Sequence, residues 1–463
     1  MTSSSSLRAI EALCQKYQAV VLSFTPQRLH IAVATPPTAE MMAALRFTAQ
    51  GAIEVEYWPP ARLEQYRQER PAAAVTDAEN SETTIQRIDN LLALAVQQRA
   101  SDIHIEPQPE ALRIRFRVDG VLQNVPAQPG DNGAALLARL KILASLDIAE
   151  RRIPQDGQFT LPLQGKPASF RLSTLSTRCG EKAVIRLLQN DTQSVALENL
   201  GMSPTSLRHY REALARPQGL ILVTGPTGSG KTFTLYSGLS SLNTPGRNLC
   251  SVEDPVEIPL PGVNQTQVHP KAGLDFNLVL RALLRQDPDV IMIGEIRDAE
   301  TAEIAIKAAQ TGHLVLSTLH TNSTAETLTR LRQIGIPGYL LASALKLVIA
   351  QRLVRRLCPH CRQPAEAQAH FPPDLWSGTL QDWRAVGCER CYSGFYGRLA
   401  LFEMLPVNAR LQNAIAAESS QETLLEIARQ QNHNSLFVEG LRCVNRGETT
   451  LAELNRIVAN DDG

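Results

Sequence analysis

The 463-residue sequence lacks a charge excess of either sign, a long apolar run and an apolar amino-terminal segment. Basic and acidic residues number 46 each, so the formal net charge is +0 and no global basicity favours nucleic acid as a partner. A membrane-spanning helix needs about 18 consecutive apolar residues, and runs such as 219–224 and 345–350 are much shorter. The start, MTSSSSLRAIEALC, has no apolar core of a secretory signal. These absences predict a cytosolic chain.

Cysteine is too sparse and too unevenly placed for a disulfide framework. Of eight cysteines, four are scattered and four form two CxxC pairs. Because cytosolic thiols stay reduced, paired cysteines in such a chain favour a metal site. The scattered ones are Cys14, Cys179, Cys250 and Cys443.

The length predicts several domains, because one hydrophobic core rarely serves so long a chain. Residues 1–70 read as a short α/β module, with strands predicted near 20–24, 29–34 and 53–58 and a helix near 41–50. Residues 71–82, PAAAVTDAENSE, lack apolar periodicity and predict a linker. We expect four further segments: an α/β domain at 83–205, a mostly parallel core at 206–355, a cysteine-bearing insertion at 356–395 and a helical region at 396–463.

A phosphate-binding motif follows the first apolar run of the core. The run 220–224 predicts a buried strand and 233–242 a helix, and between them lies GxxxxGK[ST] in its required context. Glycines allow backbone N–H groups to surround phosphate oxygens, while the lysine reaches the terminal phosphates and the threonine hydroxyl binds Mg²⁺. The nucleotide-binding residues predicted here are Gly225, Pro226, Thr227, Gly228, Ser229, Gly230, Lys231 and Thr232.

Polar residues follow the later strands of the predicted core. Acids at 253–257 and 295–298 come after apolar runs, and a third strand, 314–319, is bracketed by His313 and His320. Ligands of a doubly wound sheet bind at one edge, beyond the carboxyl ends of the strands. A phosphate-transfer site is one interpretation. The alternative is that Glu253 and Asp298 cap helices and that the two histidines are structural.

The cysteine pairs are Cys358 with Cys361 and Cys388 with Cys391. Four thiolates from two such turns can close a tetrahedral structural Zn²⁺ site. Redox chemistry is the alternative interpretation, although a redox CxxC normally works alone. His360 and His370 are possible spare ligands.

The core motifs resemble the GspE/PilB family of secretion and pilus-assembly ATPases. The segments GPTGSGKT, SVEDPVEIP, RQDPDVIMIGEIRD and AQTGHLVLSTLHT are similar to its Walker A, Asp box, Walker B and His box, and the similarity spans roughly Thr83 to Leu405. The resemblance implies a multidomain α/β fold: a RecA-like P-loop ATPase core preceded by a PAS-like domain and a short amino-terminal module, with a zinc-binding insertion. ATP, Mg²⁺ and Zn²⁺ are the cofactors it implies.

The resemblance also implies roles in hydrolysis. Glu257 corresponds to the general base and Glu295 to the Walker B acid near Mg²⁺, while His313 and His320 correspond to sensors of the γ-phosphate. Lys231 completes the catalytic set, and Glu253 and Asp254 support it. Arginines of the preceding domain act on a neighbouring nucleotide in these hexameric motors, and the candidates are Arg113, Arg115, Arg117, Arg171 and Arg186.

The partners of the chain, and whether it drives assembly or retraction, are likewise expectations from the family. They comprise a homo-hexamer, an inner-membrane platform protein of the GspF/PilC type and a membrane-anchored cytoplasmic subunit that docks residues 1–70; no nucleic acid is expected. The tetracysteine insertion favours assembly over retraction, and the chain is similar in size and domain order to the short enterobacterial HofB kind. No RLGxxL-type repeat for cyclic di-GMP is visible. Pilus retraction, DNA-linked translocation and a non-hydrolysing scaffold remain the alternatives.

Overall fold

The protein is seen in a computed structural model that describes residues 10, 14, 17, 19–25, 28–38, 41–42, 45, 49, 52–60, 62–63, 75–109, 111–126, 132–163, 165–188, 195–269, 272–373, 375–431 and 433–458. The chain divides into two compact units, Met1–Leu91 and Leu92–Gly463. In the described part of the chain, no helix is both long and apolar enough to span a membrane.

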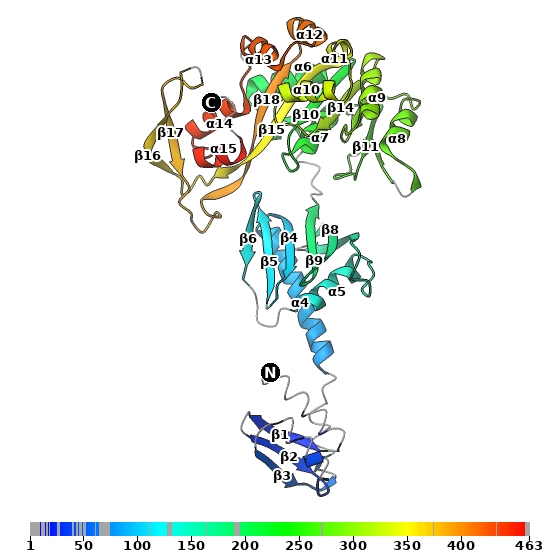
Figure 1. The fold of residues 1–463 in the computed structure, drawn as a ribbon, viewed down its shortest axis with the longest axis vertical. Coiled ribbons are helices and arrows are strands. Elements are labelled where there is room, and N and C mark those ends of the chain that lie inside the picture. The colour runs from blue at the N-terminus through cyan, green and yellow to red at the C-terminus, as the bar shows by residue number, and fades with distance from the viewer. Residues whose placement is uncertain are drawn as a thin grey trace. The chain divides into compact units, whose positions relative to one another are not determined.

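The first unit contains a three-stranded sheet (Figure 1). Its strands are β1 (Val20–Thr25), β2 (Arg28–Val33) and β3 (Ala52–Tyr57), with β2 antiparallel to β1 and parallel to β3. Leu29, Ile31 and Val33 alternate along β2 and enter the core of this unit, as expected for a strand with one covered face. The three predicted strands are confirmed. The described positions of the predicted helix, 41, 42, 45 and 49, are helical.

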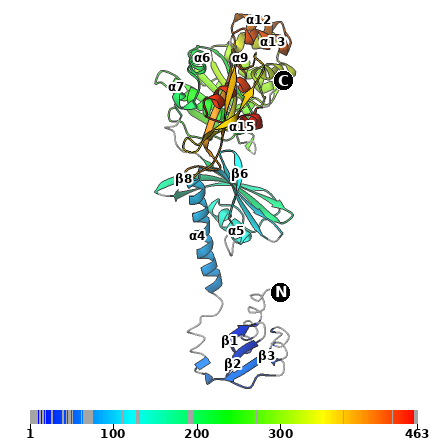
Figure 2. The same cartoon turned by 90° about the vertical axis from the view of Figure 1, so that its left-hand side faces the viewer.

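Helix α4 (Val75–Gln97) corrects the predicted linker. Residues 71–74 of that linker lie outside the described residues, but residues 75–82 are helical, and Figure 2 shows α4 as one uninterrupted helix. The apolar stripe of the helix begins later, with Ile88, Leu91, Leu92 and Ala95 buried. Once a helix has nucleated, each added residue gains a backbone hydrogen bond, so a segment with no apolar periodicity can extend it.

The next domain is a six-stranded antiparallel sheet in the order β6-β5-β4-β9-β8-β7. Ile103, Ile105, Phe116, Phe170 and Leu172 alternate along its strands and are buried, which matches the period of two read from the sequence. The elements are β4 (Ala100–Pro107), β5 (Leu112–Val118), β6 (Val121–Val125), α5 (Gly133–Leu143), β7 (Gln155–Leu163), β8 (Lys166–Thr177) and β9 (Gly180–Leu188).

The core is a seven-stranded sheet in the order β12-β11-β13-β14-β10-β15-β18. All of its pairings are parallel except that of β15 with β18. This is the mostly parallel sheet that the apolar runs predicted. Its strands are β10 (Gly219–Thr224), β11 (Leu249–Glu253), β12 (Asn264–Gln267), β13 (Val290–Ile293), β14 (Leu314–Leu319), β15 (Leu345–Leu357) and β18 (Phe395–Pro406).

Strand β10 is covered on both faces. Leu220 and Leu222 pack into one hydrophobic cluster, and Ile221 and Val223 pack into another on the opposite face. Complete burial of each such side chain contributes about 1.5–3 kcal/mol. Figure 2 shows α6 and α7 on one side of the sheet and α12 and α13 on the other. The helices are α6 (Pro204–Leu214), α7 (Lys231–Leu242), α8 (Phe276–Leu283), α9 (Ala299–Gln310), α10 (Thr324–Gln333), α11 (Gly338–Ala344), α12 (Ala409–Ala416), α13 (Gln421–Arg429), α14 (Leu436–Asn445) and α15 (Leu451–Ile457).

Three predicted boundaries fall inside elements of the core. The boundary at 355/356 lies inside β15, which continues to Leu357. Val195, Leu197 and Leu200, around the 3₁₀ turn Leu197–Leu200, pack into the same cluster as α6 and α7, so the boundary at 205/206 comes too late. The boundary at 395/396 comes too early, because β18 continues to Pro406 as the edge strand. At these boundaries the sequence pattern changes gradually. The packing of residues 195–200 and the pairing of β18 with β15 depend on the tertiary structure.

The insertion between β15 and β18 is a two-stranded hairpin of β16 (Gln363–His370) and β17 (Thr379–Arg384). It lies beside α14 and α15 in Figure 1. Leu380 of β17 packs into a hydrophobic cluster with Leu436, Phe437 and Leu441 of α14. The hairpin is therefore anchored to the helical end of the chain as well as to the sheet.

Candidate functional site

The loop after β10 has a backbone that only glycine adopts without strain. Gly225, Gly228 and Gly230 have φ values of 149°, 81° and 87°. A Cβ at Gly225 would lie 2.5 Å from the carbonyl oxygen of Gln351, so the loop also passes too close to β15 for a side chain. Gly230 precedes α7 with no side chain capping that helix. The first amides of α7 are thus available to an anion.

Lys231 lies across this loop. Its ammonium group donates to the carbonyl oxygens of Gly225 (2.7 Å) and Pro226 (3.1 Å). Burial lowers its pKa to about 8; the charge of Glu295 opposes this shift and that of Arg352 adds to it. A polyphosphate placed on the loop would replace carbonyl partners with negatively charged ones and favour the ammonium form.

Two hydroxyl groups complete the loop. The side-chain oxygen of Ser229 is buried, and the described residues give it no hydrogen-bond partner. Thr232, on the first turn of α7, is exposed. A buried orphan hydroxyl, an uncapped helix and a glycine cradle fit a bound polyphosphate, because such a ligand satisfies all three.

The parallel register brings later strand ends to the same edge as the loop. Val223 aligns with Thr318, and Ile293 aligns with Ser317, so Glu295 and His320 follow neighbouring strands. The Nε2 atom of His320 lies 3.1 Å from the carboxylate of Glu295. Burial by itself raises the pKa of Glu295, but Arg297 and His320 outweigh it, and the net pKa is lowered. Glu295 is therefore an anion at neutral pH.

Glu253 is a buried support for Glu257. Tyr236 donates to its carboxylate, as do Ser251 (2.6 Å) and Gln265 (3.1 Å), and burial raises its pKa. The Tyr236 oxygen in turn accepts from the backbone N–H of Glu257 at 3.1 Å. Among the described residues, no group pairs with the Glu257 carboxylate, which is exposed. The alternative of Glu253 as a helix cap is wrong; Asp298 does cap α9, accepting from Thr301 at 2.8 Å.

His313 lies at the wrong end of β14 for the predicted role. The structure places it before Leu314, beside the start of β10, with Nδ1 3.0 Å from the carbonyl oxygen of Ala308. The six residues of β14 separate it from His320, or roughly 20 Å of extended chain. Only His320 reaches the P-loop edge of its own chain. The two histidines flank β14 symmetrically in the sequence. In a parallel sheet, however, only the carboxyl end of β14 lies at the same edge as the glycine loop.

Sequence reasoning missed two polar residues behind the loop. Gln351 accepts from the hydroxyl of Thr234 at 2.7 Å, and Arg352 donates to the carbonyl of Asn322 at 2.9 Å. Both are almost fully buried. The only signal was a polar pair inside the apolar run LKLVIAQRLV, which is unusual because a buried polar group requires partners.

The five candidate arginines lie on one antiparallel sheet and are held by its own acids. Glu106 and Asp102 are the buried centres of these contacts. Burial raises the pKa of Glu106, but hydrogen bonds from Arg115 and Lys182 outweigh it and bring it to about 2. The ion pairs are Arg113 and Arg115 to Glu106 (3.0 and 2.8 Å), Arg186 and Arg117 to Asp102 (2.9 and 3.8 Å), and Arg171 to Asp156 (3.9 Å). Arg117 also donates to the carbonyl oxygen of Gly120 at 2.9 Å. Among the residues that the structure describes, no contact assigns any of these arginines to the P-loop.

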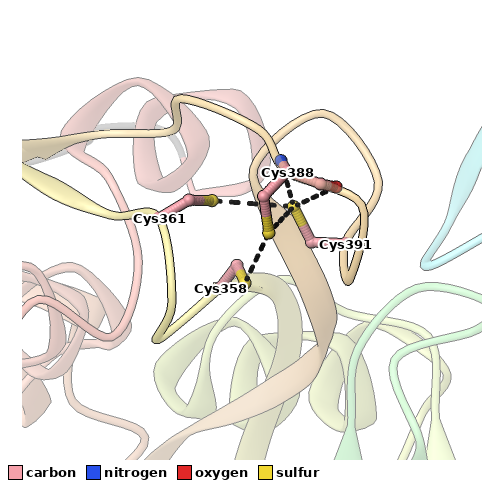
Figure 3. A group of neighbouring side chains, drawn as sticks. All are labelled: Cys358, Cys361, Cys388 and Cys391. Carbon is pink, nitrogen blue, oxygen red and sulfur yellow. Dashed lines mark hydrogen bonds between the residues drawn. The ribbon is translucent and has the colours of Figure 1, made fainter.

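The four paired cysteines converge at the base of the hairpin, as Figure 3 shows. Their sulfur atoms all lie within 4.8 Å of one another, with separations of 3.9 Å for Cys358 to Cys388 and 3.6 Å for Cys361 to Cys391. Zn–S bonds of about 2.3 Å in a tetrahedron require sulfurs about 3.8 Å apart. The donor set fits Zn²⁺. Among the described residues, no histidine joins this cluster, so His360 and His370 are not needed as ligands.

The sheet and its loop edge place this chain among the P-loop ATPases. Over residues 77–456 it matches the family described as T2SSE, Type II/IV secretion system protein. The chain belongs to this family, which confirms the family and enzyme class predicted from the motifs.

Known proteins agree with this placement. The chain is 53% identical over 455 residues to the protein transport protein HofB homolog of Escherichia coli (98% of this chain, 99% of the relative). It is 47% identical to the type IV pilus assembly ATPase PilB of Pseudomonas aeruginosa (84% and 69%) and 45% identical to the type II secretion system ATPase E of Vibrio cholerae (82% and 76%). The pilus retraction motor PilT with bound ADP aligns at a TM-score of 0.54 and 25% identity (80% and 96%). The Legionella pneumophila ATPase DotB, at 22% identity and a TM-score of 0.60 (80% and 94%), shares the fold.

Proposed function

We propose that this chain is a motor that hydrolyses ATP to power assembly of a type IV pilus or a type II secretion pseudopilus at the inner membrane. The observation that carries the proposal is the Glu295–His320 pair at the same sheet edge as the glycine loop and Lys231. Relatives named as a pilus assembly ATPase and a type II secretion ATPase support the biological role.

The roles proposed here are those that the family resemblance implies, and the geometry of each group supports them. Glu257, exposed and held through Tyr236, is the base that orients and deprotonates the attacking water. Lys231 and the amides of α7 bind the phosphates, and His320 senses the γ-phosphate from beside Glu295. Thr232 and Glu295 would hold Mg²⁺, which neutralises charge on the phosphate oxygens when bound. Glu253 acts only by holding Tyr236.

The tetracysteine hairpin supports assembly rather than retraction in this proposal. We assign Zn²⁺ to Cys358, Cys361, Cys388 and Cys391 as a closed structural site, because four thiolates leave no open position. Residues 1–70 are the docking module for a membrane-anchored cytoplasmic subunit, and a platform protein of the GspF/PilC type receives the motor. The motor is a homo-hexamer in which a neighbouring chain supplies arginines to the nucleotide.

Turnover by matched variants tests the enzyme assignment. Lys231→Ala should lose nucleotide binding, whereas Glu257→Gln should keep binding and lose about a hundredfold or more of kcat, because only the latter leaves the phosphate cradle intact. Binding is measured with a fluorescent ATP analogue and turnover by phosphate release. Wild-type turnover in Glu257→Gln would remove Glu257 from the role of base.

A further inference from the structure

A buried carboxylate outside the nucleotide loop joins two helices by their amino ends. Glu403 lies on β18, and only 3% of its surface is exposed. One of its oxygens accepts from the backbone N–H of Thr324 at 2.9 Å, and the other accepts from that of Leu436 at 3.2 Å. These are the first residues of α10 and α14, whose N-cap serines, Ser323 and Ser435, bind amides one turn further on. Glu403 therefore occupies the positive ends of both helices at once.

Two further side chains, Thr324 and His433, surround the Glu403 carboxylate. The hydroxyl of Thr324 donates to Glu403 and lies 3.4 Å from Nε2 of His433. The side chain of His433 is buried, and its Nε2 atom lies 3.6 Å from the Glu403 carboxylate. Burial lowers the pKa of His433. The network thus joins the edge strand, α10 and the segment that precedes α14.

Helix α10 is the continuation of the loop that carries His320. Within residues 320–323, Thr321 is fixed by its N–H donating to the hydroxyl of Thr224 at 2.9 Å, and Asn322 by accepting from Arg352. Thr224 ends the strand that leads into the glycine loop. Glu326 also accepts from the N–H of Asn322 at 2.6 Å. Glu403 holds Thr324, the residue that follows this loop, and links it to the first amide of α14.

We propose that Glu403 is a positioning residue that holds the His320 loop and makes ATP turnover depend on the packing of the carboxyl-terminal helices. The inference rests on the proposed ATPase function. A Gln side chain at this position would have one oxygen and one NH₂ group, so the NH₂ group would face a helix N–H and one of the two helices would lose its acceptor. The loop would loosen while the phosphate cradle stays intact.

Glu453 offers a matched control. It is an equally buried carboxylate in α15 that pairs with Arg355 and Arg456, and the described residues show no contact between it and the His320 loop. Both Glu403→Gln and Glu453→Gln should lower the unfolding temperature. Only Glu403→Gln should lower kcat, by about tenfold with KM changed less than about twofold, because the loop acts after binding.

Hydrogen exchange of residues 320–327 gives a readout that does not need turnover. We expect exchange there to be about tenfold faster in Glu403→Gln and unchanged in Glu453→Gln. Should Glu403→Gln fail to fold, Thr324→Val removes one of the same hydrogen bonds, and Thr324→Ser restores it. Equal losses of kcat in both glutamine variants, or wild-type exchange in the folded Glu403→Gln or Thr324→Val protein, would overturn the inference. Absence of turnover in the wild-type protein would instead refute the proposed function, with exchange still deciding the role of Glu403.

Discussion

At the scale of single residues, we expect Lys231 to make nucleotide binding sensitive to pH. Its pKa of about 8 in the free protein means that the ammonium form dominates below pH 8 and is lost above it. A bound polyphosphate requires that form, so binding above pH 8 must take up a proton.

Affinity for the nucleotide should therefore fall as pH rises through about 8, by up to about tenfold per pH unit. The measurement is the Kd of a fluorescent ATP analogue between about pH 7 and about pH 9.5. Lys231→Arg is the control, because a guanidinium group stays charged throughout. Identical pH profiles for the two proteins would show that Lys231 is not the titrating group.

At the scale of elements, the four cysteines lie at the base of the hairpin of β16 and β17. β15 leads into Cys358, and β18 begins just after Cys391. A metal ion there would fix the ends of two paired strands, of which β15 also lines the back of the glycine loop through Gln351. The four sulfurs are already at the spacing a tetrahedral ion needs, so the ion would cost little rearrangement.

Changing Cys388 and Cys391 together to Ser should remove about one zinc ion per chain and lower the unfolding temperature. Elemental analysis of protein prepared without chelator measures the metal, and thermal unfolding measures the stability. Cys179→Ser removes an exposed thiol outside the cluster and should change neither. Finding no zinc in the wild-type protein would refute the assignment.

At the scale of the whole molecule, the five candidate arginines could act on the nucleotide of their own chain or on that of a neighbouring chain. Among the described residues, their ion pairs are with acids of their own sheet, and the side chain of Arg186 is 56% exposed. A neighbouring chain can therefore be its functional target. In the proposed hexamer, Arg186 would act across an interface.

Mixed oligomers test this arrangement. Arg186→Ala and Glu257→Gln should each abolish turnover alone, whereas coexpression in equal amounts should restore about a quarter of it, since about one interface in four then pairs an intact base with an intact arginine. Separate tags isolate the mixed oligomers, and phosphate release measures turnover. If Arg186 serves its own chain, the mixture stays inactive.

The sequence by itself determined the nucleotide loop, the parallel core and the cysteine pairs. These features depend on local rules: glycines at Gly225, Gly228 and Gly230 adopt positive φ, β10 is apolar on both faces, and CxxC turns present sulfurs in pairs. Strand positions in the first α/β module were equally predictable, because alternation with a period of two shows which residues face the core.

Only the tertiary structure decided which segments, distant in the sequence, lie next to each other. It separated His313 from His320, because parallel pairing gives the two ends of β14 different neighbours. After the hairpin, the chain rejoins the sheet as β18. Glu403 lies between the first residues of two helices, Thr324 and Leu436, which are 112 residues apart in the sequence. Such contacts form between segments distant in sequence, so no local pattern encodes them.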